Sequence, residues 1–296
     1  MTYSIIARDR DSGLMGVATQ SQAFAVGASV PWALPGYGVI ATQSMGEPMY
    51  GELGLDVLRS GLTAEEALKA LRVVDPHPER RQVAMVDGRG GLAVYTGDAC
   101  VGAAGHARGE DSVALANMMA SNDVWDAMIE AYEGTDGWIA KRLMAALHAA
   151  EDEGGDVRGR RSAAIMVVCA TPSGRPWHDH QVDLRVDDDP DPLDRLDRMV
   201  TYTVRYHQVV EAFELALDGE AERSLEHLGD LEIDVDEHPE LALWEAIVLG
   251  RAGRREDAER VGRELERVAP GLAEAGRRFA DVDLVDRELV ERVLGR

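Results

Sequence analysis

The feature that most constrains the fold is a series of short apolar segments in the first 100 residues, separated by polar or glycine-rich turns. The segments are Tyr3–Ala7, Leu14–Thr19, Val39–Thr42, Arg81–Val86 and Leu92–Thr96. Arg8–Gly13 joins the first two with the composition of a hairpin turn, and Asp87–Gly90 joins the last two with an Asp-Gly start, a strong hairpin signal. Strands joined by tight turns run antiparallel, so the sequence predicts an antiparallel sheet.

Helical periodicity follows and predicts helices packed on this sheet. Thr63 and Glu66 have the spacing of a capping box, which starts a helix. The predicted helices are Thr63–Leu71, Asn122–Tyr132 and Trp138–Ala150, and strand-like segments return at Ala163–Cys169 and Gln181–Val186. This order predicts an α+β fold of sheet layers covered by helices.

The aspartate- and proline-rich segment Asp187–Pro192 marks a change in composition. Beyond about Leu193 the pattern is helical, and Gly219 and Gly253 are 34 residues apart, the period of tetratricopeptide-like helical hairpins. We therefore expect one domain over residues 1–195 and a small all-α, tetratricopeptide-like module over residues 196–296.

Charge and composition exclude several classes of partner. With 31 basic and 54 acidic residues, the net charge of −23 repels both nucleic acid and anionic membranes. No segment approaches the roughly 20 apolar residues of a membrane span, and no secretory signal is visible, so we expect a cytoplasmic protein. The only lysines are Lys69 and Lys141, and this acidic, arginine-rich composition fits a halophilic source or a GC-rich genome equally well. Cys100 and Cys169 are expected to be reduced core residues.

Thr2 is the residue with the clearest catalytic chemistry. Removal of the methionine before it would leave a free α-amine beside the Thr2 hydroxyl. The pKa of such an amine is about 7.7 to 8.0, so it can take the hydroxyl proton and make one residue both nucleophile and base. Ser4 is a weaker candidate because it lacks the terminal amine. The alternative is that Thr2 is only the β-branched first residue of an edge strand.

Several motifs together resemble the bacterial and archaeal family called domain of unknown function 1028. They are Thr2–Asp9, Gly16–Ala18, Pro35–Gln43, Tyr50–Leu55, Arg80–Val83, Glu153–Ala164 and Asp183–Asp188, so the resemblance covers residues 2 to about 200. It implies a fold like that of the N-terminal-nucleophile hydrolases, in which two antiparallel sheets lie between two helical layers as a four-layer αββα sandwich. It also implies, from His238–Ala246, a C-terminal module of the kind described as peptidoglycan-binding in some members. Arg161 departs from the glutamine that the family commonly has at this position.

Polar residues near predicted strand ends form the candidate substrate-binding set. Asp156, Arg158 and Arg160 lie in a glycine-rich loop, where an arginine could hold a substrate carboxylate and Asp156 could orient an amine. The others, which could line a pocket or supply an oxyanion donor, are Gln20, Ser21, Gln43, Ser44, Glu47 and Asn117. The alternatives are a solvated loop and ordinary hydrogen bonding at strand ends. His178 and His180 have a metal-ligand spacing but no third ligand, so no metal site is predicted.

These inferences lead to two functional hypotheses from different classes. The first is an amide-bond hydrolase that acts on a small polar amide, with Thr2 as nucleophile and no cofactor. The second is a catalytically inactive hydrolase fold that serves as a binding or scaffold protein, with the helical module as its contact surface. Edge strands allow a homodimer without requiring one.

Overall fold

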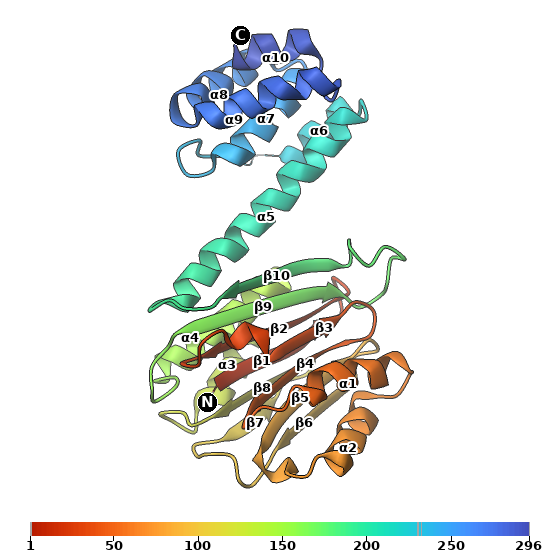
Figure 1. The fold of residues 1–296 in the computed structure, drawn as a ribbon, viewed down its shortest axis with the longest axis vertical. Coiled ribbons are helices and arrows are strands. Elements are labelled where there is room, and N and C mark those ends of the chain that lie inside the picture. The colour runs from red at the N-terminus through yellow and green to blue at the C-terminus, as the bar shows by residue number, and fades with distance from the viewer. Residues whose placement is uncertain (1, 230, 232, 296) are drawn as a thin grey trace. The chain divides into compact units, whose positions relative to one another are not determined.

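The strands of the first 200 residues form two antiparallel sheets in the computed structural model, which describes residues 2–229, 231 and 233–295 (Figure 1). Sheet A has the order β10 (His180–Val186), β9 (Ser162–Cys169), β2 (Leu14–Ser21), β1 (Thr2–Asp9), β8 (Ser112–Asn117), β7 (Gly105–Arg108). Sheet B has the order β3 (Pro31–Leu34), β4 (Gly38–Ser44), β5 (Arg81–Asp87), β6 (Leu92–Thr96). The predicted strands lie within these elements, and the antiparallel pairing is confirmed.

Helices cover the outer face of each sheet. Apolar side chains of α1 (Met49–Arg59) and α2 (Ala64–Val74) pack on sheet B, and those of α3 (Val124–Gly134) and α4 (Ile139–Asp152) pack on sheet A. A third apolar cluster joins the inner faces of the two sheets. The mixture of helices and antiparallel strands that the sequence predicts is therefore confirmed, and α2 begins with the predicted capping box of Thr63 and Glu66.

Strand β1 is buried on both faces. Because successive side chains point to opposite sides of a strand, Tyr3 and Ile5 pack toward α3 and α4, while Ile6 packs toward sheet B. Thr2 pairs with Asn117 of β8, and its neighbour Tyr3 pairs with Gln20 of β2. Thr2 therefore begins an interior strand of sheet A, and the interpretation of this residue as part of an edge strand is wrong.

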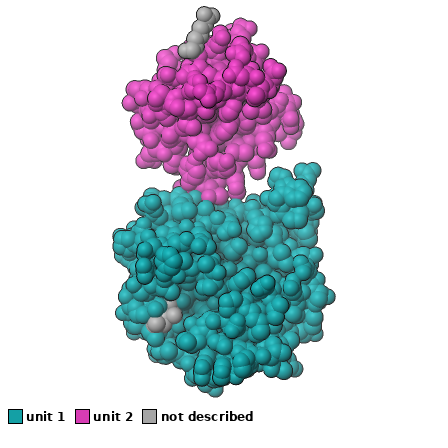
Figure 2. Space-filling view, viewed as in Figure 1, with its two compact units in different colours: residues 1–200 teal, residues 201–296 magenta. Residues whose placement is uncertain are grey.

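The chain divides into two compact units, Met1–Val200 and Thr201–Arg296, shown in teal and magenta in Figure 2. Residues of the second unit have their own apolar core, formed among others by Val209, Leu241 and Leu265. Its elements are the greater part of α5 (Pro192–Leu217), then α6 (Ala221–Leu228), α7 (Pro239–Arg251), α8 (Arg255–Val268), α9 (Pro270–Arg278) and α10 (Arg287–Leu294). Three short 3₁₀ helices complete the described elements: η1 (Val26–Ala28), η2 (Pro78–Arg80) and η3 (Phe279–Val282).

The first turns of α5 belong to the first unit. Leu193, Leu196 and Val200 are buried in the cluster that joins sheet A to α3 and α4. Asp197, on the same helix, pairs with His148 of α4. This contact raises the pKa of His148 above its usual value, because the hydrogen bond to Asp197 favours the charged imidazolium.

Candidate functional site

Thr2 lies at one end of β1, on the face that meets sheet B. It shares this face with Ser4, since the two residues are separated by one position. The Thr2 hydroxyl donates to the Ser21 hydroxyl at 3.2 Å, and the Ser4 hydroxyl lies 2.8 Å from that of Thr19. Thr2 itself is 4% exposed. The two neighbouring strands β1 and β2 thus place two pairs of hydroxyls between the sheets.

Buried amide side chains fix the backbone carbonyl of Thr2. Gln43 of β4 donates from Nε2 to this carbonyl at 3.0 Å, and Asn117 of β8 donates from Nδ2 to it at 3.3 Å. The same two amides also donate to Oε1 of Gln82 on β5, at 2.7 and 2.9 Å. The amide donors of Gln43 and Asn117 therefore already have acceptors within the protein, among them the Thr2 carbonyl.

The residues that follow Gln43 and Asn117 have an uncommon backbone conformation. Ser44 has a φ of 73° and Met118 a φ of 58°, in the left-handed region that non-glycine residues seldom adopt. Such conformations cost free energy and often accompany functional sites. Here they occur at two chain positions directly beside the amides that hold Thr2.

The glycine-rich loop places Asp156 and Arg158 next to the end of β2. Asp156 Oδ2 accepts from the amide of Gln22 at 3.2 Å, and the backbone amide of Arg161 donates to the Ser21 carbonyl at 3.1 Å. The Asp156 side chain is fully buried and accepts from the Arg158 guanidinium at 2.7 and 3.0 Å. Asp156 therefore fixes Arg158 within the loop that runs beside Ser21.

The structure brings Thr2, Ser21, Gln43 and Asn117 together, with Asp156 and Arg158 close to Ser21. The other predicted residues have separate surroundings. Glu47 accepts from the amide of Met49 at 3.3 Å at the start of α1, and Ser44 is half-buried at the end of β4. Arg160 pairs with Asp191 at 2.6 Å and lies 3.6 Å from Glu151.

Gln20 points away from Thr2. It precedes Ser21 on β2 and pairs with Tyr3, so its side chain lies on the face of sheet A that meets the helices. Both polar atoms of its amide are buried without a hydrogen-bond partner among the described residues. The neighbouring Tyr3 hydroxyl donates to Glu151 at 2.6 Å, and burial together with the Glu151 charge keeps the pKa of Tyr3 well above its ordinary value.

Residues that the sequence analysis did not select extend the amide network to a hollow of about 450 Å³. Gln82 donates from Nε2 to the Thr96 hydroxyl and to the carbonyl of Gly105, both at 3.0 Å, and both residues line this hollow. The Thr96 hydroxyl lies 2.9 Å from Nδ1 of His106. Burial lowers the pKa of His106, with a smaller effect from Arg108, so its ring is neutral near pH 7. Gln82 was not selected because nothing in the local pattern of Arg81–Val86 shows that its side chain meets the amides of Gln43 and Asn117.

A buried ion pair fixes the strand that carries Gln82. Arg81 donates from Nε to Asp75 at 2.8 Å, and Asp75 also accepts from the hydroxyl of Tyr50 at 3.0 Å. The hydrogen bond from Arg81 is the main reason that the pKa of Asp75 falls to about 2. Arg81 also donates to the carbonyl of Met45, which ties β5 to the segment that follows β4.

Comparison with known proteins places the chain in a family. The model of a family of unknown function, DUF1028, matches residues 2–196, about two thirds of the chain. The chain belongs to the DUF1028 family. The crystal structure of protein SPO2555 from Silicibacter pomeroyi, which carries the same family label, is similar to this DUF1028 protein with a TM-score of 0.61 and 32% sequence identity. The similarity covers 68% of this chain and 88% of that one. No curated protein matches this DUF1028 protein.

Within residues 2–229, 231 and 233–295, no three His, Cys, Asp or Glu side chains come together as metal ligands would. Over the same residues, no helix combines the length and apolar character that a membrane crossing needs.

Proposed function

We propose that this DUF1028 protein is an amide-bond hydrolase of the N-terminal-nucleophile type that acts on a small polar substrate. The proposal assigns Thr2 as the nucleophile once the preceding residue is removed. The observation that carries it is the placement of Thr2. Its hydroxyl lies 3.2 Å from that of Ser21 at the end of an interior strand, and two amides hold its carbonyl. The order of helix, sheet, sheet and helix layers supports a sandwich of the N-terminal-nucleophile hydrolase kind.

The chemistry needs no group beyond Thr2 for nucleophile and base. The Thr2 amine takes the hydroxyl proton as Oγ attacks the substrate carbonyl, which forms a tetrahedral intermediate. The amine then gives this proton to the leaving nitrogen, the C–N bond breaks, and an ester to Thr2 remains. Water attacks this ester with the amine again as base, which releases the acid and restores the hydroxyl. Ser21 orients Oγ, and Gln43 and Asn117 hold the backbone of the nucleophile in place.

The test is intact-mass measurement followed by hydrolysis of a panel of small amides. We expect the purified chain to begin at Thr2 and to release amine from at least one amide. Thr2→Ala should lower this rate by at least about a thousandfold, since the variant lacks the nucleophile. Ser60→Ala, which removes an exposed hydroxyl at the residue after α1, serves as the matched control. Hydrolysis of an amide by a chain that keeps its first methionine would refute the assignment. So would a Thr2→Ala variant that hydrolyses the amide as fast as the unchanged chain.

The second candidate is a catalytically inactive hydrolase fold that serves as a binding or scaffold protein. Two observations favour this candidate: Thr2 is only 4% exposed, and the amide donors of Gln43 and Asn117 already have acceptors. Polar groups that are already hydrogen-bonded need no substrate as a partner. The same experiment separates the two candidates: a retained methionine together with no hydrolysis supports the scaffold.

We also propose that the second unit contains tetratricopeptide-like hairpins. Gly219 and Gly253, the two residues matched by the 34-residue period, have φ values of 84° and 79°. Each lies in a short turn between consecutive helices, Gly219 between α5 and α6 and Gly253 between α7 and α8. Glycine at a left-handed position ends a helix and permits this tight turn.

A further inference from the structure

Strand β10 leaves one edge of sheet A without a partner strand. It is the outermost strand of that sheet, and Figure 1 shows it at the edge. It has seven residues, whereas the other edge strands are shorter: β7 and β3 have four residues each and β6 has five. Within the described part of the chain, no backbone hydrogen bond joins Val182–Val186 to a residue outside sheet A. An open edge of this length offers N–H and C=O groups to a further strand.

The side chains of β10 alternate between two faces. Val182, Leu184 and Val186 face the helices, where they pack with the core that joins sheet A to α3 and α4. Asp183 and Arg185 are exposed on the opposite face. The edge therefore carries one acidic and one basic side chain, separated by a single apolar residue.

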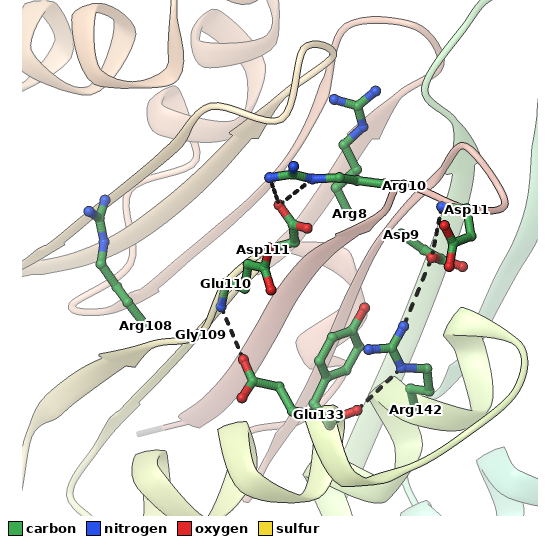
Figure 3. Close-up of a pocket in the computed structure, with 11 residues that line it drawn as sticks. Arg8, Asp9, Arg10, Asp11, Arg108, Gly109, Glu110, Asp111, Glu133 and Arg142 are labelled. Atoms are coloured by element: carbon green, nitrogen blue, oxygen red, sulfur yellow. Dashed lines mark hydrogen bonds and ion pairs between the residues drawn. The ribbon is translucent and has the colours of Figure 1, made fainter.

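The Asp183 carboxylate is available to a partner, since it makes no hydrogen bond or ion pair with another described residue. Nε of Arg185 lies 2.9 Å from Asp187, and the guanidinium has further N–H donors. Charges on the β7 side of sheet A differ, because they pair within the chain. There Arg10 donates to Asp111 at 2.9 and 2.6 Å, at the turn between β7 and β8 (Figure 3).

The regular part of β10 is centred on Leu184. A bulge just before Val182 interrupts the pairing with β9, and the strand ends at Val186. The two charges of this regular segment lie one position to either side of its centre. When two such segments pair antiparallel with Leu184 opposite Leu184, Asp183 of each copy faces Arg185 of the other.

The charges select this register over its neighbours. A two-fold axis at Asp183 would place two carboxylates directly opposite each other, and an axis at Arg185 would do the same with two guanidinium groups. Like charges directly opposite destabilise a strand pair, whereas opposite charges stabilise it. Charged side chains often protect an edge strand from pairing, but here they oppose only the wrong registers. The edge is therefore complementary to itself in the register centred on Leu184.

We propose that β10 pairs with β10 of a second copy of this chain, antiparallel and with the two-fold axis at Leu184. The pairing joins the two copies of sheet A into one continuous sheet and adds about four to six main-chain hydrogen bonds. On the helix-covered face Leu184 meets Leu184, and Val182 meets Val186. Strands β9 and β2 lie between β10 and the strand of Thr2, so this inference does not rest on the proposed function.

Sedimentation equilibrium of the full chain tests this pairing, and we expect a reversible monomer–dimer equilibrium. Asp183→Arg and Arg185→Asp each place like charges opposite at two symmetric positions. Each variant should therefore raise the dimer dissociation constant at least about tenfold. The double variant restores opposite charges and should recover most of the original affinity. Asp98→Arg, which makes the same charge change in the exposed loop between β6 and β7, is the matched control.

Three results would overturn the proposal. The first is a chain that stays monomeric at every concentration. The second is a loss of dimer in Asp183→Arg that Asp98→Arg shares. The third is a double variant that does not recover the dimer, because the register centred on Leu184 requires that it does.

Cysteine substitution tests the register separately. Two copies of residue 184 would lie directly opposite, with Cα atoms about 4.5–5.5 Å apart, which permits a disulfide. We expect Leu184→Cys to form a disulfide-linked dimer under mild oxidation, as seen on a non-reducing gel. Gln181→Cys is the matched control, because its two copies would lie six positions apart along the strands, about 20 Å. Equal cross-linking of the two variants, or none in Leu184→Cys, contradicts the assigned register.

Discussion

Replacement of Gln43 by methionine tests the amide network at Thr2. The side chain is 1% exposed and its polar atoms lie within hydrogen-bond distance of four partners: Ser4, the carbonyls of Thr2 and Leu115, and Gln82. Methionine has a similar length and makes none of these bonds. The two hydrogens of Nε2 serve three acceptors, so the side chain makes about three full neutral hydrogen bonds, which contribute about 1.5–4.5 kcal/mol to stability.

Second partners reduce the expected loss for Gln43→Met. The Ser4 hydroxyl can still donate to Thr19, and both Gln82 Oε1 and the Thr2 carbonyl keep the Asn117 amide. These groups therefore escape the full penalty of an unpartnered buried atom. We expect the free energy of unfolding of the first unit to fall by about 2–3 kcal/mol, in the lower half of that range.

Urea unfolding of the full chain, followed by circular dichroism, measures this change. With a denaturant dependence of about 2–3 kcal/mol per molar urea, the midpoint of the first unit should fall by about 1 M. Gln181→Met is the control, because the Gln181 amide donates to the carbonyl of His178 on the protein surface. A shift below about 0.2 M for Gln43→Met, or the same shift for both variants, would refute the role of this network.

Two further predictions concern ionisable groups. The fall in the pKa of Asp75 from 3.8 to about 2 stabilises the folded state above pH 4, and this contribution is lost as the pH falls toward 2. Asp75→Asn should therefore lower the free energy of unfolding by at least about 2.4 kcal/mol at pH 7 and by about half of that at pH 3, as measured from urea midpoints. Equal losses at both pH values would contradict this prediction. Burial raises the pKa of Glu245 on α7 from 4.5 to about 7, so the stability of the second unit should decline as the pH rises through this range. Glu245→Gln should raise its urea midpoint at pH 8 and leave it nearly unchanged at pH 4, and a midpoint that does not rise at pH 8 would count against this reasoning.

The strands flanked by tight turns were predictable because hairpin composition and apolar alternation agree there. Leu92–Thr96 has the same bounds in the sequence prediction and in the structure. Edge strands β3 and β7 have four residues each, too few to show a period, and β3 begins with Pro31. Each pairs with the strand that follows it after a three-residue connection, β4 and β8 respectively, so their shortness and not a distant partner hid them.

Helix α1 was not predictable from local propensity. It contains Gly51 and Gly54, and glycine disfavours a helix interior. The structure explains both: a Cβ at Gly51 would lie 2.3 Å from the ring of Trp32, and one at Gly54 would lie 2.7 Å from Ile40 Cδ1. The close approach of α1 to sheet B therefore requires glycine at these positions. The packing gained by this approach outweighs the loss of helix propensity.

For the candidate site, the sequence indicated which polar residues lie near strand ends, but it did not indicate which face of the sheet each side chain occupies. Gln20 and Ser21 are consecutive in β2, so only one of them can face Thr2, and the pairing register selects Ser21. Gln43 and Asn117 reach Thr2 from β4 and β8, and that proximity follows only from the packing of the two sheets. Gln82 was missed for the same reason, because a lone glutamine within an apolar segment shows its role only through its partners.

The match to the family model ends at residue 196, inside α5, which runs from Pro192 to Leu217. A fragment cut at that point would lack Val200, which fills the core beside sheet A, and Asp197, which pairs with His148. The segment matched by the family model is therefore shorter than the segment that packs as one body. Truncated forms designed for crystallisation or activity screening should retain at least residue 200, and a cut after Leu217 would also keep the helix whole.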